Sequence, residues 1–335
     1  MSGNAFKQTE RMSTETLENL KRLLTTLSTS NDFNISKPHF PEFFKSKEDH
    51  GDLDVFLSDT VQNRCAVNEL AMIAYRNEQP DHPWVDMGVF AKHNSTVEPS
   101  ERYLIQTEGS SQLRLKSTEG KWCHVDVQFV PSNCLSFSAH YYSYGDLSQL
   151  LQIWLRNFKM VLKNTGLYYK TVTAGVEHLV LITTDWFAVL DILELNHSPY
   201  RGYAFEDFRD AFIWMERSHL FKPDMLDLRK GDKRASRPMF TALREHKFNE
   251  YTYQRFSTID ISYKVLERLP ESFQAIMMAK VNDLAHCSVD QQFYALNNII
   301  NISSMKRSNF DGNTNLSVFD DGGYSKLVKD NKLPF

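Results

Sequence analysis

The sequence predicts an α+β fold, in which a mixed β-sheet is flanked by helices and followed by a mainly helical region. Two observations point to this class. Segments that alternate apolar with polar residues, as half-buried strands do, are confined to the first half of the chain. Most of the second half repeats its apolar residues every three or four positions, as amphipathic helices do. The change of periodicity near Thr171 predicts two domains, residues 1–170 and 171–335.

The first domain is expected to combine helices with strands. Leucines spaced three and four residues apart predict a helix from Ser13 to Leu27, which Ser13 or Thr14 can cap. A strand is expected to start near Asp52, and the spacing in TVQNRCAVNELAMIAY, residues 60–75, is helical again. The remaining strands of the sheet are expected in RYLIQTE, SQLRLKS and KWCHVDVQFVP, residues 102–108, 111–117 and 121–131.

Helical spacing dominates from Gly145 onward. The stretch DLSQLLQIWLRNFKMVLKN, residues 146–164, places its apolar residues on one wide stripe, and Gly166 is expected to end this helix. Further helices are expected over residues 186–195, 205–217, 238–247, 263–268 and 274–297. The polar tail from Phe310 contains glycines and is expected to be partly disordered or to dock on the surface.

The composition is that of a globular protein, and the motifs that are missing exclude several reaction classes. Hydrophobic residues make up 41% of the chain and charged residues 24%, so disorder is not indicated. The formal net charge of −4 provides no overall attraction to a polyanion, and a nucleic-acid site would have to be a local patch. The sequence has no P-loop, no dinucleotide-binding glycine pattern and no Ser-His-Asp order.

Cysteine usage and hydropathy indicate where the protein resides. Its four cysteines include no CxxC pair, which argues against a zinc ribbon and against a disulfide framework. The N-terminal segment is too charged for a signal peptide, and no segment is apolar for long enough to span a bilayer. We therefore expect an intracellular protein, either cytoplasmic or nuclear.

A pair of acids begins the most informative pattern in the sequence. In GDLDVFLSD, residues 51–59, Asp52 and Asp54 lie on one face of the expected strand, and the apolar residues lie on the other. Two adjacent carboxylates repel each other unless a cation or a hydrogen-bond network lies between them. Taken alone, such a pair is also typical of an Asx-turn or of the solvated start of a strand.

The strand expected over residues 121–131 supplies a third acid. Its apolar face comprises Cys123, Val125, Val127 and Phe129, and its polar face comprises His124, Asp126 and Gln128. This polar face is expected to point away from the core. If the two strands are neighbours, three carboxylates converge on one surface, a ligand set suited to two Mg²⁺ ions in phosphoryl transfer. The alternative is a solvent-facing polar side of a two-layer sheet.

The motifs GDLDVFLSD and HVDVQFVP together resemble the palm of the DNA polymerase beta superfamily of nucleotidyltransferases, in particular its family X branch. The family pattern is Gly-Asp-h-Asp-h on one strand and h-Asp-h on a later one, where h is apolar. Family X palms continue through a proline, an aromatic-rich turn and a helix to a Gly-Leu pair, here VPSNCLSFSAHYYSYGDLSQLLQIWLRNFKMVLKNTGL. The resemblance covers about residues 35–168 and implies a nucleotidyltransferase palm followed by a helical C-terminal domain.

The resemblance also implies roles for individual residues. Asp52 and Asp54 would bind both catalytic metal ions, which are Mg²⁺ or Mn²⁺. Asp126 would bind the ion that activates the attacking hydroxyl and could serve as its base. The residues that would contact the nucleotide are Gly51 in the first motif and Tyr142, Tyr144 and Gly145 in the aromatic-rich turn.

The chain departs from the family where the triphosphate is held. The family has a Gly-Ser pair about ten residues before the first aspartate, and its backbone amides and hydroxyl cradle the phosphates. Pro41 and Glu42 occupy those positions here, and a proline has no N–H to donate. Lys45, Ser46 and Lys47 could bind the phosphates instead, or they could form a solvated loop.

A basic run, RKGDKRASRP at residues 229–238, is the one stretch expected to contact a polynucleotide. Its cations are Arg229, Lys230, Lys233, Arg234 and Arg237. Such a run is also typical of a solvated loop. Aromatic residues make up 13% of the chain, and the cluster HYYSY could stack on bases while most of the others fill the core.

These features predict an enzyme, a metal-dependent nucleotidyltransferase that moves a nucleoside monophosphate from an NTP such as ATP to a hydroxyl group. Finger and thumb signatures are missing, so the expected activity is a template-independent terminal transferase on RNA or DNA. A protein or a small molecule is the alternative acceptor. A catalytically silent relative that binds a nucleotide or a partner is a second hypothesis, motivated by Pro41 and Glu42.

Overall fold

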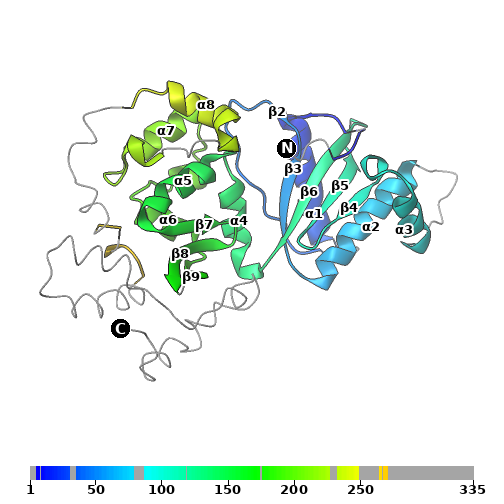
Figure 1. Cartoon of the computed structure of the whole chain (residues 1–335). Coiled ribbons are helices and arrows are strands. Elements are labelled where there is room, and N and C mark those ends of the chain that lie inside the picture. Colours follow the sequence, from blue (N-terminus) through cyan, green and yellow to red (C-terminus); the bar gives the residue numbers. More distant parts are fainter. Residues whose placement is uncertain are drawn as a thin grey trace, which may run out of the picture. The chain divides into compact units, whose positions relative to one another are not determined.

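The structure is a computed structural model of the chain, and it describes residues 5–7, 9–30, 35–78, 87–117, 119–173, 176–226, 232–248, 264–265 and 267–270 (Figure 1). The chain separates into two compact units, Met1–Ala139 and His140–Phe335, which we call unit 1 and unit 2. This boundary lies earlier than the one expected near Thr171. The reason is that Thr171 lies inside a single strand, β8 (Gly166–Thr173), which pairs with β7 before it and with β9 after it.

Unit 1 contains a mixed sheet with the strand order β3-β6-β5-β4 (Figure 1). β3 (Leu53–Ser58) and β6 (Trp122–Val130) are parallel, whereas β5 (Ser110–Lys116) pairs antiparallel with both β6 and β4 (Leu104–Gln106). A short antiparallel pair, β1 (Met12–Ser13) with β2 (Asp49–His50), forms a separate sheet. The predicted strands, and the prediction that they belong to one mixed sheet, are confirmed.

The helices of unit 1 bury one face of this sheet. They are α1 (Thr14–Thr29), α2 (Val61–Glu78), α3 (Met87–Thr96) and the 3-10 turn η1 (Pro99–Glu101). The leucines of α1 and the apolar face of α2 share one core with β3, β5 and β6, to which Leu53, Val55, Leu57, Cys123, Val125 and Val127 contribute. Because side chains alternate along a strand, Asp54 and Asp126 lie on the opposite face of the sheet.

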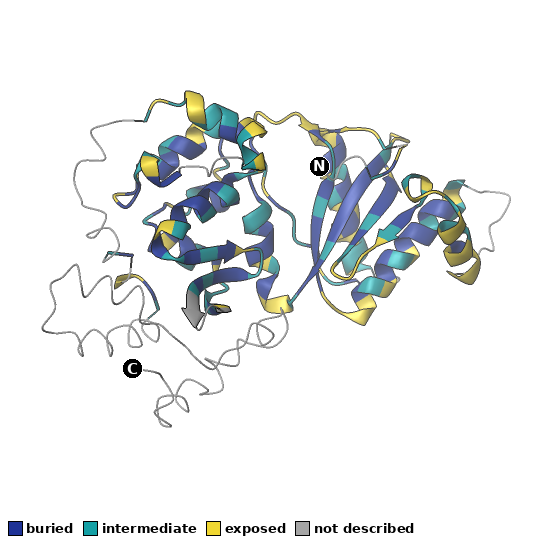
Figure 2. Cartoon of the chain, in the orientation of Figure 1, coloured by how far each residue is buried: buried dark blue, intermediate teal, exposed yellow. Residues whose placement is uncertain are grey.

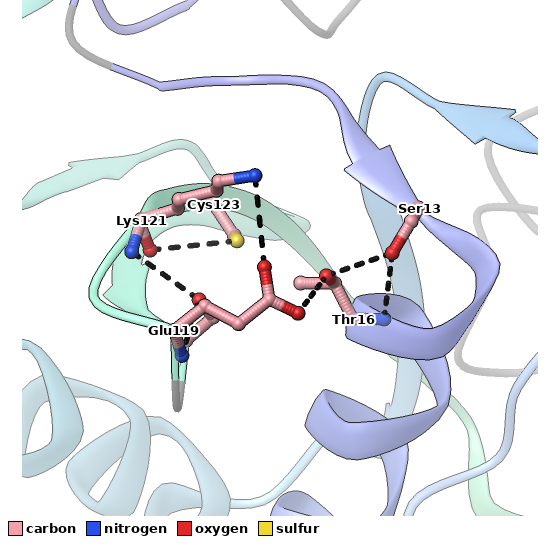
Figure 3. Close-up of polar contacts among 6 residues, drawn as sticks. Ser13, Thr16, Glu119, Lys121 and Cys123 are labelled. Carbon is pink, nitrogen blue, oxygen red and sulfur yellow. Dashed lines mark hydrogen bonds and ion pairs between the residues drawn. The ribbon is translucent and has the colours of Figure 1, made fainter.

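Polar contacts fix the N-terminus of α1 to the turn between β5 and β6 (Figure 3). Ser13 caps the helix, as predicted, because its Oγ accepts a hydrogen bond from the Thr16 amide at 3.2 Å. The Thr16 hydroxyl donates to Glu119 Oε1 at 3.1 Å, and Lys121 Nζ lies 3.6 Å from Glu119 Oε2. The Glu119 carboxylate also faces the positive end of the helix dipole, so it holds α1 against the sheet.

The polar face of β6 points away from the helix-covered core, as expected, but its residues His124 and Asp126 are buried and do not form the alternative, a solvent-facing polar side. His124 is 0% exposed and Asp126 is 4% exposed, and Figure 2 shows β6 buried along most of its length. Phe6, from the N-terminal segment, packs its ring edge-on against His124 with the centroids 5.2 Å apart. Backbone bonds from Lys7 to Ser100 and from Glu10 to Trp122 hold that segment in place. The acids of the site therefore lie in a partly dry environment.

Unit 2 begins with helix and continues into a small antiparallel sheet. α4 (Leu135–Tyr142) crosses the boundary between the units, and α5 (Leu147–Leu155) follows it. The predicted helix over residues 146–164 is too long, because α5 passes into the 3-10 turn η3 (Arg156–Phe158) and Lys159 adopts a left-handed φ of 56°. The chain then forms β7 (Met160–Lys163), β8 and β9 (Val176–Thr183).

The remaining elements of unit 2 are helical, as predicted. They are α6 (Trp186–Ile192), α7 (Phe208–Glu216) and α8 (Pro238–Glu245), with 3-10 turns η2 (Ser132–Cys134), η4 (Ser198–Tyr200), η5 (Pro223–Leu226) and η6 (Lys233–Ser236) along the chain. The helix expected over 274–297 and the tail from Phe310 lie outside the described residues. Among the helices that the structure describes, none combines the length and apolarity of a bilayer-spanning segment.

Candidate active site

Asp54 and Asp126 occupy directly opposed positions on neighbouring strands. The register of the parallel pair β3–β6 matches Leu53 with Val125 and Asp54 with Asp126. The sequence left open whether these strands are neighbours, and the pairing answers that question. Asp52 precedes β3 by one residue and lies two positions before Asp54. The fold thus places the predicted acids along one strip of the sheet, where Asp52 and Asp54 are half-buried and Asp126 is buried.

Crowding of negative charge makes Asp54 difficult to ionise. Burial, followed by the charges of Asp52 and Asp126, raises the pKa of Asp54 from 3.8 to about 7. Lys47 and His124 act in the opposite direction and lower it. A carboxyl group with such a pKa gains stability from any cation that approaches it. The electrostatics of the strip therefore favour binding of a positive charge.

His124 lies beside Asp126 beneath the surface. Its Nε2 is 3.1 Å from Asp126 Oδ1, but the two atoms are not aligned for a hydrogen bond. Neither of these atoms nor His124 Nδ1 has a hydrogen-bond partner among the described residues. Buried polar atoms are normally paired, so this group is poised to bond to something else. The sequence placed His124 on the polar face but gave no sign that it would be fully buried.

The chemistry of the acidic strip fits a hard divalent cation. Carboxylate oxygens are the ligands that Mg²⁺ and Mn²⁺ prefer, and Asp126 Oδ1 is a buried acceptor without a hydrogen bond. As the side chains lie, no three His, Cys, Asp or Glu residues within the described ranges are arranged to hold a metal ion. Asp52, Asp54 and Asp126 would therefore have to reorient their side chains to share one.

The loop before β3 carries Lys45, Ser46 and Lys47, which the sequence offered as ligands of the phosphates. The Lys47 amide donates to the Phe44 carbonyl at 3.0 Å, which closes a turn whose corner residues, Lys45 and Ser46, are exposed. The charges of Asp52 and Asp54 act on the ammonium of Lys47. Lys47 is therefore a cation of this loop that interacts electrostatically with the acidic strip.

The positions around this turn clarify the departure from the family pattern. Gly51 lies in the half-buried bend between β2 and β3. Pro41 is buried and Glu42 is exposed. Because a proline has no N–H and glutamate adds a negative charge, neither side chain nor ring can replace the hydroxyl and amide of a Gly-Ser pair.

The aromatic turn predicted to line the nucleotide pocket belongs to unit 2, and its residues differ in exposure. Tyr144 is 0% exposed, its hydroxyl donates to the Pro199 carbonyl, and its ring packs on Tyr200 and Phe205. Its side chain thus belongs to the core of unit 2, whereas the sequence placed it in the pocket. Tyr142 is half-buried and packs against Tyr141, and Gly145 is exposed with a φ of 63°.

Much of the predicted basic patch is neutralised in the structure. Arg234 Nε lies 2.8 Å from an oxygen of Asp232, and Arg237 forms an ion pair with Asp146. Lys233 is exposed in η6, and Arg229 and Lys230 lie outside the described residues. An acid pairs with each described arginine of the run, so its attraction for a polynucleotide is weaker than its sequence suggests.

Comparison with known proteins finds similar solved structures, but no protein-family model and no curated protein matches the chain. Among solved structures, the ternary gap complex of Leishmania infantum polymerase beta aligns with 56% of this chain and 68% of its own, at 12% identity and a TM-score of 0.36. The ternary P/T complex of the same polymerase aligns with 56% and 75%, at 12% identity and a TM-score of 0.35. Both TM-scores are low.

Proposed function

We propose that this protein is a metal-dependent nucleotidyltransferase that moves a nucleoside monophosphate from an NTP to a hydroxyl acceptor. The observation that supports this proposal is the in-register pair of Asp54 and Asp126, with Asp52 two residues before Asp54. Three acids on one sheet surface, one of which has its pKa raised to about 7, form an environment that favours a divalent cation. The resemblance of GDLDVFLSD and HVDVQFVP to the family X palm agrees with this assignment.

In this proposal the protein positions reactants and supplies charge, and it forms no covalent intermediate. Asp52 and Asp54 would hold Mg²⁺ or Mn²⁺ between themselves and the phosphates. A divalent ion, when bound, would neutralise phosphate charge and lower the pKa of the attacking hydroxyl. Asp126 would hold its proton-accepting oxygen towards that hydroxyl, and His124, whose Nε2 lies 3.1 Å from Asp126 Oδ1, would have to realign to bond to the carboxylate.

The acceptor is proposed to be the end of an RNA or DNA strand, extended without a template. Support comes from the basic run, in which Lys233 and Arg237 are exposed and Arg237 is paired with Asp146. The acceptor could instead be a protein or a small molecule, and the site geometry is the same in each case. We also propose that the protein works inside a cell, in agreement with the reduced thiols of Cys65 and Cys123.

The proposal is tested by incubating the full chain with Mg²⁺ or Mn²⁺ and each labelled NTP or dNTP. RNA, DNA and protein acceptors are supplied in parallel, and the double variant Asp52→Asn/Asp54→Asn serves as the control. We expect label to enter at least one acceptor with the wild-type protein and not with the double variant. No incorporation into any acceptor, or equal incorporation by the variant, would sink the proposal.

A second candidate function is nucleotide or partner binding without chemistry. It is favoured by Pro41 and Glu42, and by the side-chain positions of the acids, which do not converge on one point within the described residues. The two functions separate at Asp126. If the protein is an enzyme, Asp126→Asn abolishes transfer but leaves NTP binding within a fewfold of wild type, because only the reaction needs its base.

A further inference from the structure

Two lysines from separate parts of unit 1 bring their ammonium groups to one aromatic ring. Lys21 comes from α1 and Lys47 from the loop before β3. Their Nζ atoms lie 5.0 Å and 4.9 Å from the centroid of the Phe43 ring. The two ammonium groups therefore cannot be farther apart than the sum of these distances. The ring face attracts both cations and partly offsets their mutual repulsion.

The surroundings leave Lys47 the less satisfied of the two. Lys21 Nζ forms an ion pair with Glu18 at 2.7 Å, and only 16% of its side chain is exposed. Lys47 is exposed, and its ammonium forms no ion pair with a carboxylate in the part of the chain that the structure describes. Arg11, whose charge also acts on Lys47, is held by Asp49 at 2.5 Å. An anion arriving from solvent would thus find Lys47 accessible.

A buried histidine lies beneath the same ring and stays uncharged. His50 is 1% exposed, and its ring meets Phe43 edge-on with the centroids 4.8 Å apart. Burial, followed by the charges of Lys47 and Lys21, lowers the pKa of His50 to about 4. We call Lys21, Phe43 and Lys47 the two-lysine cluster. The charges of both lysines therefore act on His50, and His50 adds no third charge beside the cluster at neutral pH.

The two-lysine cluster adjoins the acidic strip. Asp52 and Asp54 act electrostatically on Lys47, and Lys47 in turn lowers the pKa of Asp54. A ligand that is both a polyanion and a partner of divalent cations would satisfy the two features at once. Its anionic oxygens would meet the ammonium groups, and a cation bound to it would meet the carboxylates. The β- and γ-phosphates of a nucleoside triphosphate have this chemistry.

We propose that Lys47, supported by Lys21 and positioned by Phe43, binds the terminal phosphates of the nucleotide. The identity of the ligand in this assignment rests on the proposed function. The existence of a cationic site does not. It supplies positive charge a few residues after Pro41 and Glu42, where the loop offers no Gly-Ser pair. Lys21 contributes long-range charge, because its ammonium is already paired with Glu18, and the Phe43 ring positions both ammonium groups.

Binding of inorganic tripolyphosphate, without divalent metal, tests the cationic site by itself. Titration calorimetry is carried out on the full-length wild type and on Lys47→Gln, Lys47→Arg and Lys21→Gln. We expect Lys47→Gln to lose about tenfold or more in affinity, the typical loss for one charge-assisted phosphate contact, and Lys21→Gln to lose less. Lys47→Arg should retain most of the affinity. Lys92→Gln, an exposed lysine on α3, is the matched control and should bind as wild type does.

Steady-state kinetics then separates this inference from the proposed function. If both hold, Lys47→Gln raises the KM for NTP about tenfold and leaves kcat nearly unchanged, because the contact is made equally before and during reaction. If tripolyphosphate binding depends on Lys47 but no nucleotide transfer is detected, the phosphate site is supported and the proposed enzyme activity is refuted. Transfer with an unaltered KM in Lys47→Gln, or equal tripolyphosphate binding by Lys47→Gln and Lys92→Gln, would refute the phosphate site and leave Lys47 as a counter-ion of the acids.

Discussion

Asp54 on β3 and Asp126 on β6 are paired residue to residue across a parallel strand boundary, and the charge of Asp126 helps to raise the pKa of Asp54 to about 7. The sheet register that brings the two carboxyl groups together also makes them repel each other. In the absence of a cation this arrangement costs folding free energy, and the cost depends on pH.

Replacement of Asp54 by asparagine should stabilise the metal-free protein at alkaline pH. Because the pKa of Asp54 is higher in the folded state, the folded protein binds more protons than the unfolded one between about pH 4 and pH 7. The wild-type free energy of unfolding therefore falls as the pH rises through this range, and Asp54→Asn removes that fall. At pH 8 the variant should gain roughly 2–4 kcal/mol over wild type, and near pH 4 no such gain.

Urea unfolding in a chelating buffer measures this difference, with the peptides of unit 1 followed by pulsed hydrogen exchange and mass spectrometry. Asp59→Asn, an exposed acid just after β3, is the matched control. Stability curves for wild type and Asp54→Asn that run parallel from pH 4 to pH 8 would contradict the assigned cause.

Divalent cations should stabilise unit 1 more at alkaline than at acid pH. A metal ion binds the deprotonated carboxylates, so it competes with the proton that Asp54 holds below about pH 7. We expect Mn²⁺ or Mg²⁺ at millimolar concentration to raise the unfolding temperature by several degrees at pH 8 and by little at pH 5. Asp126→Asn should remove most of the rise, and Asp59→Asn should keep it. Differential scanning fluorimetry provides the measurement; a rise that is independent of pH would speak against carboxylate ligands.

Acidification should destabilise unit 1 through His50. The folded state keeps this residue neutral down to about pH 4, whereas the unfolded chain protonates it near pH 6.5. The unfolded state thus binds the additional proton, and stability is lost as the pH falls from about 6.5 towards 4. His50→Gln should flatten this decline by roughly 2–3 kcal/mol. His93→Gln is a suitable control in the same unfolding experiment, because His93 on α3 is only half-buried.

Removal of the Arg114 side chain should destabilise the sheet of unit 1. Arg114 is 2% exposed, with its guanidinium 4.0 Å from the Tyr103 ring centroid, 4.8 Å from that of Trp122, and 3.3 Å from Glu78. Arg114→Ala leaves Glu78 without this partner and opens a space between two rings, which should cost unit 1 about 3 kcal/mol. Lys116→Ala, an exposed cation on the same strand, should cost less than about 0.5 kcal/mol. Equal effects of the two variants in urea unfolding would show that the buried stack contributes nothing.

The sheet of unit 1 could be predicted because one of its faces is buried against helices. Leu53, Val55 and Leu57 alternate with polar positions, and this pattern both identifies a strand and assigns Asp54 to the other face. The pairing of Asp54 with Asp126 did not follow from the sequence, since neighbours in a sheet are set by tertiary packing. From the sequence, the acids converge only if the two strands are neighbours, which is what the resemblance to a known palm implies.

Burial of the polar face could not be predicted from the strand itself. The side chain that contacts His124 is Phe6, which lies far away in the sequence and in a segment without regular spacing. Similarly, the relation of Lys47 to the acids depends on a turn closed by the Phe44 carbonyl, which composition alone does not reveal. Contacts of this kind arise from the path of the backbone and leave no local pattern.

The β7–β8 hairpin was missed because its sequence also suits a helix. Met160 and Leu162 extend the apolar spacing of α5, and Gly166 resembles the glycine that follows a helix. In the structure Gly166 opens β8 instead, and a Cβ atom there would lie 2.8 Å from the Thr183 carbonyl oxygen. The glycine is required by close approach of two strands, which no periodicity can indicate.

β3 and β6 are adjacent in the sheet but distant along the chain, with α2, α3, β4 and β5 between them. β5 and β6 can pair through a short turn as soon as both have been synthesised, whereas β3 can join β6 only once the long intervening segment has been ordered. Asp54 and Asp126 therefore meet late in folding, and their repulsion opposes that step. A divalent cation present during folding should offset this repulsion and so favour the pairing of β3 with β6.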